Sequence, residues 1–544
     1  ELETTYSFDK DDLNSINLQS DFFIGHTRYP TGKPPSAHAA QPVDGRSATN
    51  GECVNVAQVR ILLQRAAHEL KLLGYCYRDY GQPDSAELNQ FVKAIVHLNQ
   101  YYRSENSAIP ELTSTDVYAL LMMPDQTRHD WGLVGRWWHY QGFRAEGPQT
   151  VVSLDVKFEE DKPYTTLTVV RDPQKRRPFM SAADANAEGS TVIQGGSENG
   201  IFFSESLDAK TLSDCVSVKV AKGSVTYEDI DFKDSFISKY LEQQESKLRL
   251  LEDACIFIQP VEDSVPRLKQ SAVHGPEPFN TGKSVIEGFI KTGKGEMGSL
   301  GRRAAFPDKS SKQKLPTGSL AHQYFAQLFV TIVAPPVDFK REGSGGSAFT
   351  ATGFKPSLGD LATVNVMSSS LLSSYVISES LVDQLLERDD TVEISVVFNT
   401  DQTLLEHVNI VLDQVENTVK KGHGTVIISD RDILKSDEHQ RTYPSFWLMD
   451  KITNTLNFMI QNREIERMPT LIACMSDLLD GQSAAMAKAF GADIVCPWAA
   501  FCFAKDQSGI RNIIAGLQSE VDVAFSRLGV LNANSYTGLK SDAM

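Results

Sequence analysis

The sequence predicts an α+β domain followed by an α/β domain with a parallel sheet and helices on both faces. Two helix-period segments precede a run of short strands in the first half, and strands alternate with helices beyond residue 391. A length of 544 residues exceeds one ordinary core, so we expect two domains of roughly 200 to 270 residues each. We place them at residues 1–260 and 346–544, and residues 261–345 form a connector and the start of the second domain.

Composition narrows the class of protein. The formal net charge of -17 argues against a nucleic-acid-binding surface, which needs clustered Lys and Arg. We find neither an apolar run of roughly 18 to 20 residues, as a membrane span needs, nor a signal-peptide pattern. The seven cysteines form no CxxC pair, which favours reduced thiols over disulfides or a metal site. A soluble protein of the cytoplasm or the plastid stroma is therefore expected.

The first domain begins with two helices. Apolar residues recur at helical spacing between Asn55 and Gly74, and a second helix is expected from about Ser85. Asp84 and Glu87 have the spacing of a capping box at the start of that helix. Short strands then follow between Trp131 and Asp231, at 137–138, 151–156, 167–170, 201–203 and 216–220. An amphipathic helix over residues 236–257 is expected to close the domain.

In the second domain, predicted strands alternate regularly with predicted helices. A connector rich in Pro, Gly and Ser and a helix over residues 320–333 come first. The strands predicted next are 392–398, 425–428, 471–474 and 494–495, and the helices are 402–420, 444–461, 482–490 and 508–528. Sites in such parallel sheets lie at the carboxyl ends of the strands. These ends are Asn399-Thr400, Ser429-Asp430-Arg431, Ser476-Asp477 and Cys496-Pro497-Trp498.

The stretch from Asp21 to Glu52 has the polar groups of a binding site. Arg28 follows an apolar run, and its guanidinium could bind a carboxylate through two hydrogen bonds. Asn50-Gly51 could form an oxyanion hole from the side-chain amide and the glycine N–H. Each feature also has a plain structural explanation: a surface arginine at a strand end and a common turn dipeptide. For Asp84, binding a substrate ammonium group and capping a helix remain equally good explanations.

The order of these features resembles the glutaminase domain of class II, N-terminal-nucleophile glutamine amidotransferases. The resemblance covers roughly residues 20 to 230, with six motifs in family order. In this sequence they are Gly25-His26-Thr27-Arg28, Ala40-Gln41-Pro42, Asn50-Gly51-Glu52, Pro83-Asp84-Ser85-Ala86-Glu87, Val170-Arg171-Asp172-Pro173 with Arg177-Pro178, and Phe203-Ser204-Glu205-Ser206. The resemblance implies an αββα sandwich, truncated here at its N-terminal side.

The second half of the chain contains a further series of distinctive segments: Gly295–Gly301, Tyr324–Phe329, Ala334–Glu342, Gly491–Pro497, and Arg527–Gly529 with Asn534–Gly538. These segments resemble the central domain of glutamate synthase, so that glutamate synthase is the best fit within the amidotransferase family. The family's flavin- and iron–sulfur-bearing synthase domain and its Gly-rich β-helix have no counterpart in this chain. No cofactor is expected here, and FMN and iron–sulfur clusters are expected on a partner.

The resemblance implies roles for individual residues. Arg28, Thr31 and Asp84 would bind glutamine, with Arg28 on the α-carboxylate and Asp84 on the α-amino group. Asn50 and Gly51 would hold the oxyanion. The family's nucleophile is a cysteine at the mature N-terminus that uses its own α-amine as base. Here residue 1 is Glu1 and the first cysteine is Cys53, so the nucleophile is absent from the chain.

Two explanations of the missing cysteine lead to two hypotheses. Either an upstream segment bears it, or the domain serves as a scaffold without catalysis. Retention of the glutamine-binding set favours the first explanation. The first hypothesis is a glutamine amidotransferase component that supplies ammonia to a partner synthase domain or subunit. The second is a non-catalytic structural or regulatory subunit. Both imply an oligomer with protein partners, and an amidotransferase with a different synthase partner is a third possibility.

Overall fold

The computed structural model of the protein describes part of the chain in detail. The described residues are 47–53, 56–78, 84–114, 116–117, 145–159, 162–171, 179–184, 191–196, 210–211, 215–221, 224–229, 236–253, 255–256, 287–293, 350–399, 401–435 and 440–527. They divide into two compact units, which we describe separately. Unit 1 comprises residues 1–131, 145–240 and 362–364, and unit 2 comprises residues 132–144, 241–361 and 365–544.

Unit 1 contains the two helices that apolar periodicity predicts. Helix α2 spans Val56–Leu72 and helix α3 spans Asp84–Glu105. The two helices contact each other, and the apolar stripe of α2 is buried at Val59, Leu63, Ala66 and Leu70. Gly74 follows α2 with φ 88°, a left-handed conformation that glycine adopts without a Cβ clash, so the helix ends at the boundary that the apolar spacing predicts.

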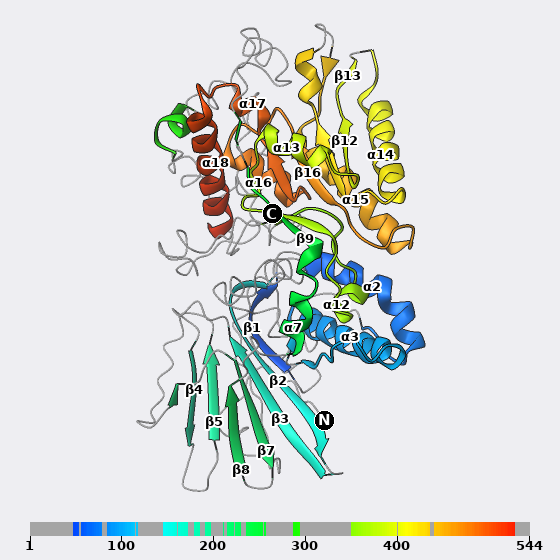
Figure 1. Cartoon of the computed structure of the whole chain (residues 1–544), viewed down its shortest axis with the longest axis vertical. Helices are drawn as coiled ribbons and strands as arrows, with labels where there is room; N and C mark the ends of the chain where they lie inside the picture. The colour runs from blue at the N-terminus through cyan, green and yellow to red at the C-terminus, as the bar shows by residue number, and fades with distance from the viewer. Residues whose placement is uncertain are drawn as a thin grey trace, which may run out of the picture. The chain divides into compact units, whose positions relative to one another are not determined.

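The strands of unit 1 form two antiparallel sheets (Figure 1). The larger sheet has the order β1-β2-β3-β7-β8, with strands Ser47–Cys53, Ala145–Glu159, Lys162–Arg171, Cys215–Ala221 and Ser224–Asp229. The smaller sheet has the order β5-β4-β6, with strands Thr191–Gly196, Phe179–Asp184 and Lys210–Thr211. The predicted strands 151–156, 167–170 and 216–220 are confirmed, while 137–138 and 201–203 lie outside the described residues.

The helix predicted over residues 236–257 is wrong in its second half. Helix α7 covers only Phe236–Glu242, and after a 3₁₀ turn, η2 (Glu245–Lys247), the chain forms strand β9 at Leu248–Leu251. The partner of β9 is β11 (Ser369–Leu372), with which it pairs in parallel, and β10 (Thr350–Ala351) pairs with β11 from the other side. A partner strand more than 100 residues away thus overrides the local helical period.

Unit 2 is built on a four-stranded parallel sheet in the order β12-β14-β16-β17. Its strands are Thr391–Ser395, Thr425–Ser429, Thr470–Cys474 and Ile494–Cys496. The three strands after β12 are buried at every residue, which is the pattern of a parallel sheet covered on its faces. The predicted parallel α/β arrangement is therefore confirmed. The first predicted strand is shorter than expected, because Phe398–Asn399 forms a separate strand, β13, that pairs with β15 (Gln440–Arg441).

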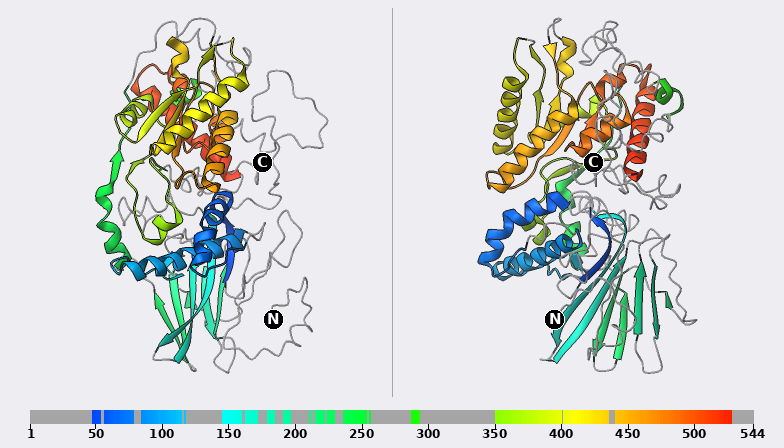
Figure 2. Two further views of the ribbon diagram at one scale, coloured as in Figure 1. Left: turned by 90° about the vertical axis from the view of Figure 1, so that its right-hand side faces the viewer. Right: turned by 180° about the vertical axis from the view of Figure 1, so that it is seen from behind.

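The helices of unit 2 confirm the predicted alternation (Figure 2). Helix α14 (Leu404–Lys420), α15 (Ser445–Gln461) and α16 (Gly481–Ala489) connect successive strands, and α18 (Gln507–Arg527) follows β17. Thr403 and Glu406 form a capping box at the start of α14. The remaining helical segments described here are α12 (Leu358–Ala362), α13 (Glu379–Leu386), η4 (Arg431–Lys435), α17 (Trp498–Phe501) and residues 287–292.

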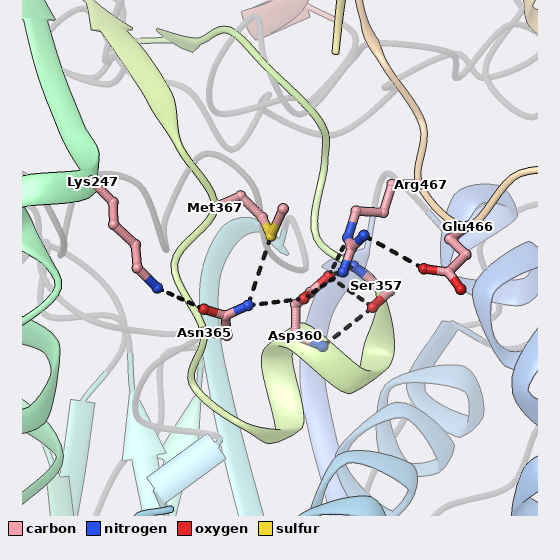
Figure 3. Close-up of polar contacts among 7 residues, drawn as sticks. All are labelled: Lys247, Ser357, Asp360, Asn365, Met367, Glu466 and Arg467. Carbon is pink, nitrogen blue, oxygen red and sulfur yellow. Dashed lines mark hydrogen bonds and ion pairs between the residues drawn. The ribbon is translucent and has the colours of Figure 1, made fainter. Parts of the chain in front are cut away.

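A group of polar contacts around Asp360 ties separate segments of unit 2 together (Figure 3). Arg467 donates from Nε and Nη2 to the two carboxylate oxygens of Asp360, at 2.7 and 2.9 Å. The same carboxylate accepts from the N–H and hydroxyl of Ser357 at the start of α12, at 2.9 and 2.8 Å. Asn365 donates to Asp360 at 3.3 Å and accepts from Lys247 at 2.8 Å. The Asp360 group therefore joins η2, α12 and the segment before β16.

The pKa of Asp360 predicts how this group responds to acid. Burial opposes ionisation, but the hydrogen bonds from Arg467 and Ser357 outweigh it and lower the pKa below 3.8. A lowered carboxylate pKa contributes stability that is present above about pH 4 and is lost as the pH falls through the folded-state value. We expect Arg467→Ala to reduce the free energy of unfolding by about 2 kcal/mol at pH 7. Urea denaturation at pH 7 and pH 3 measures this, and the difference should shrink at pH 3.

A matched control is available in the neighbouring residue. Glu466 lies 3.5 Å from Nη1 of Arg467, and its side chain is 73% exposed. Glu466→Gln should therefore change the free energy of unfolding by less than about 0.5 kcal/mol at either pH. An Arg467→Ala effect of the same size at pH 3 and pH 7 would show that the ionised Asp360 carboxylate is not the stabilising partner.

Candidate functional site

The predicted glutamine-binding residues lie partly within the described structure. Arg28 and Thr31 lie outside the described residues. Asn50 and Gly51 lie within β1, and Asp84 is the first residue of α3. Strand β1 and helix α3 contact each other in unit 1. The structure thus places the predicted oxyanion residues, Asn50 and Gly51, and the predicted ammonium-binding residue, Asp84, on elements that contact each other. The roles of their side chains remain predictions.

Asn50-Gly51 does not form the turn that its dipeptide commonly makes. In the pairing of β1 with β2, Asn50 lies opposite Thr150 and Glu52 lies opposite Glu146, so the register shifts at Gly51. Gly51 therefore lies opposite residues 147–149 of β2 and has no Cα partner of its own in the strand register. Such bulges redirect the backbone locally, and glycine is the residue that tolerates the irregular conformation. The turn interpretation is wrong, because pairing with a distant strand decides the backbone here.

The sheet edge of unit 2 brings together several of the strand-end residues predicted to form sites. Asp430, directly after β14, is fully buried. Its Oδ1 accepts hydrogen bonds from the N–H of Ser476 at 2.9 Å and from the indole N–H of Trp498 at 2.7 Å. Its Oδ2 accepts from the hydroxyls of Ser476 at 2.6 Å and Thr442 at 3.0 Å. Burial raises the pKa of Asp430 despite these donors. We call these four residues the Asp430 network.

Asp477 extends this network to the start of helix α15. Its Oδ2 accepts from the N–H and the hydroxyl of Ser445, at 2.8 and 3.0 Å, so it supplies a carboxylate to a helix N-terminus. Pro444 precedes Ser445 at the N-cap and makes no side-chain capping bond itself. Burial and repulsion from Asp430 raise the pKa of Asp477 to about 7, although Ser445 opposes the shift. Asp477 can therefore keep a proton close to neutral pH.

Arg431 is held by carboxylates of its own unit. Its Nε and Nη2 donate to Glu393 at 3.0 and 2.8 Å, and its Nη1 donates to Asp383 at 2.9 Å. Its side chain is 17% exposed. Arg431, the cationic strand-end residue predicted as part of a site, is therefore already neutralised by two acidic side chains.

Of the remaining strand ends, Asn399 lies in β13 opposite Gln440, and Thr400 lies outside the described residues.

Three of the five thiols described in the structure are buried: Cys255, Cys474 and Cys496. Cys76, Cys255, Cys474, Cys496 and Cys502 carry free thiols, and the reduced state of the chain stays a prediction. Burial, together with Asp253, raises the pKa of Cys255 to about 11, and burial beside Cys474 raises the pKa of Cys496 well above its ordinary value. A thiol that stays protonated is a poor nucleophile. Neither Cys255 nor Cys496 is suited to replace an N-terminal nucleophile.

Residues of the Gly491–Pro497 segment have structural roles. Gly491 ends the turn after α16 with φ 121°, and a Cβ on it would lie 1.9 Å from Oγ1 of Thr453. Asp493 forms an ion pair with Lys355 at 2.7 Å and accepts from the N–H of Leu471 at 3.0 Å. These requirements explain a glycine and an acid at this spacing without any ligand.

Sequence reasoning missed several partners in this region. Thr442 and Ser445 were not named as site residues, since neither stands at the end of a parallel strand. Their place beside Asp430 and Asp477 depends on the path of the chain between β14 and α15. Arg60, which pairs with Glu87, was missed for the same reason.

Within the described residues, no group of three metal-ligating side chains is present, and none of the helices is apolar over enough of its length to span a membrane.

A comparison with known families supports the resemblance of the second half. Residues 279–541 match the glutamate synthase central domain. The match includes the segments from Gly295 to Gly538 that carry the resemblance, together with the Asp430 network and Asp477. The chain is therefore related to glutamate synthase through this central domain.

Asp477 generates a prediction about pH and stability. Because its folded-state pKa is raised to about 7 from 3.8, the folded protein keeps a proton that the unfolded chain releases. The stability of the wild type should therefore fall as the pH rises from about 4 to 7. Asp477→Asn cannot ionise, and its oxygen can still accept from Ser445. We expect the variant to be more stable than the wild type at pH 8 by at least about 1 kcal/mol, and less so at pH 5.

Thermal or urea unfolding of both proteins between pH 5 and pH 8 measures this difference. The control is Asp450→Asn, which changes an acid of the same helix α15 that accepts from Asn454 and pairs with Lys451, and it should not reproduce the gain in stability at pH 8. Parallel stability curves for the wild type and Asp477→Asn would contradict a proton held on Asp477.

Proposed function

We propose that this chain is the glutamine-binding amidotransferase component of a glutamate synthase-like system. In this proposal it supplies ammonia from glutamine to a partner synthase domain or subunit. The observation that carries it is the match of residues 279–541 to the glutamate synthase central domain. That domain follows, in this chain, a segment whose motifs resemble those of class II amidotransferases in family order.

The architecture of unit 1 is compatible with this proposal. An antiparallel five-stranded sheet accompanies two long helices, as one half of an αββα sandwich requires. Asn50 and Gly51 lie at an irregularity of β1, where the backbone leaves the regular ladder. Asp84 begins a helix that contacts this strand. These placements support a shared site for the three residues.

The chemistry follows from the residue types. Arg28 would bind the α-carboxylate of glutamine through its planar guanidinium, Thr31 would belong to the same binding set, and Asp84 would pair with the α-ammonium group. A cysteine thiolate would attack the side-chain amide carbon, form a γ-glutamyl thioester and release ammonia. The Asn50 amide and the Gly51 N–H would stabilise the negative oxygen that forms during attack. Water would then hydrolyse the thioester to glutamate.

The nucleophile and the acceptor chemistry belong outside residues 1–544 in this proposal. The cysteine would stand at an N-terminus upstream of Glu1. FMN and iron–sulfur clusters, which would reduce the acceptor, would be carried by the partner. Within this chain, unit 2 would provide the framework that connects glutamine hydrolysis to that partner.

The second candidate function is a non-catalytic structural or regulatory subunit. The Asp430 network favours it for unit 2, because the donors around this buried carboxylate come from the protein itself. An edge of a parallel sheet that is filled in this way serves packing rather than ligand binding. The two functions differ in one measurable property, which is the recognition of glutamine.

Glutamine binding tests the proposal directly. Isothermal titration calorimetry of the natural protein should show binding of L-glutamine. Arg28→Ala should cost about 2 kcal/mol, a roughly 30-fold weaker Kd, because the α-carboxylate loses a charged donor pair. The control is Arg249→Ala, which removes an exposed arginine of β9 and should leave the Kd unchanged. If neither variant alters the heat of glutamine addition, the scaffold function stands.

The nucleophile can be sought by covalent labelling. A diazoketone analogue of glutamine, 6-diazo-5-oxo-L-norleucine, alkylates a thiolate that is positioned to attack the side-chain carbonyl. We expect the natural protein to gain one label, on an N-terminal cysteine upstream of Glu1, and excess glutamine should protect it. Intact-mass measurement and peptide mapping locate the label. A natural N-terminus at Glu1, with no glutamine-protected label, would rule out catalysis by this chain.

A further inference from the structure

The segment that follows α2 is attached along one side of α3. Three of its residues, in chain order, contact three α3 residues that lie successively closer to the start of that helix. The contacts are Leu73 O with Nε2 of His97 at 2.8 Å, the hydroxyl of Tyr75 with the side chain and carbonyl of Gln90, and the hydroxyl of Tyr77 with Oε2 of Glu87 at 3.3 Å. The segment therefore runs antiparallel to α3 and ends beside its first turn.

Glu87 is the last of these attachment points, and it is also an ion-pair partner of α2. Its side chain is fully buried, and its Oε1 accepts from Nε of Arg60 at 2.9 Å. Tyr77 donates to the other oxygen. A buried carboxylate is costly unless donors surround it, so both oxygens are held by groups from outside α3. The first turn of α3 is thereby attached to α2 and to the returning segment.

Asp84 begins the same turn. It stands three residues before Glu87, and residues at this spacing are neighbours on a helix surface, roughly 4.5 Å apart along the axis. The two contacts of Glu87 therefore restrain the piece of backbone that carries Asp84. An apolar residue of similar size at position 87 could pack as stably as a buried ion pair, so stability alone does not call for a charge here.

We propose that Glu87 is a positioning residue: through Arg60 and Tyr77 it fixes the first turn of α3, so that Asp84 meets the α-ammonium group of glutamine. This inference rests on the proposed function and names a further residue of its binding site. Glu87 does not contact the substrate. Its effect passes through the backbone to one substrate group and leaves the carboxylate and amide groups to other residues.

The test compares two ligands. L-Glutamine carries the α-ammonium group, and 4-carbamoylbutanoate is the same molecule without it. In the natural protein we expect glutamine to bind at least about 10-fold more tightly than the analogue, since the charged contact with Asp84 is lost. Glu87→Gln should raise the Kd for glutamine about 10-fold and change the Kd for the analogue by no more than about twofold. Asp84→Asn should also remove the preference for glutamine over the analogue. The double variant with Asp84→Asn and Glu87→Gln should bind glutamine no more weakly than Asp84→Asn alone.

The ratio of the two affinities separates positioning from a general structural role. A loosened or partly unfolded domain would lower the affinity for both ligands by the same factor. The control is Glu111→Gln, which removes the Arg103–Glu111 ion pair of 3.0 Å near the opposite end of α3 and should leave the ratio unchanged. Tyr77→Phe removes a single donor from Glu87 and should lower the ratio about two- to threefold if Glu87→Gln does not fold.

Each outcome decides between the possibilities. Equal weakening of both ligands by Glu87→Gln, or no change in either while Asp84→Asn removes the preference, would overturn the positioning role and leave the proposed function intact. Failure of the natural protein to bind glutamine would overturn the proposed function and this inference with it. A loss of preference in Glu87→Gln and Tyr77→Phe, but not in Glu111→Gln, is the result that we expect.

Discussion

The buried carboxylate of Asp430 is the interaction on which the sheet of unit 2 depends. It has no exposed surface, so its oxygens must find donors within the protein. Those donors come from segments that follow β15, β16 and β17, and one side chain thus joins the carboxyl ends of neighbouring parallel strands. Asp477 adds the N-terminus of α15 to the same region. The edge of the sheet that often binds ligands in other α/β proteins is occupied here by the protein's own polar groups.

Unit 1 uses buried polar groups in a different way. Residues 86–90 of α3 are buried although three of them are polar, and the carboxylate of Glu87 joins this helix to α2 and to the returning segment. The irregular pairing of β1 at Gly51 lies on an element that contacts α3. Polar groups in unit 1 thus gather around elements whose sequence resembles a glutamine site. In unit 2 they gather around the ends of a packed sheet, which fits the proposed division between glutamine recognition in unit 1 and a framework in unit 2.

The relation to the glutamate synthase central domain is consistent with that division. The matched residues 279–541 include Gly491, whose conformation and proximity to Thr453 require a residue without a side chain, and Asp493, which pairs with Lys355. Both positions are explained by packing and hydrogen bonding. The chemistry proposed for this chain lies instead in its first 110 residues, where Arg28, Asn50, Gly51 and Asp84 occur in family order.

Periodicity in the sequence was enough to predict α2, α3, the four parallel strands and the helices between them, because these elements follow from the local spacing of apolar residues. The sequence also placed Asp430 and Asp477 at strand ends. Only the tertiary structure decided that Leu248–Leu251 is a strand, that Asn50-Gly51 lies in a bulged strand, and that Trp498, Thr442 and Ser445 meet the two acids. Each of these outcomes depends on a partner distant in the chain. Local patterns carry no information about such partners, because the free energy that selects them comes from pairing and burial in the folded protein.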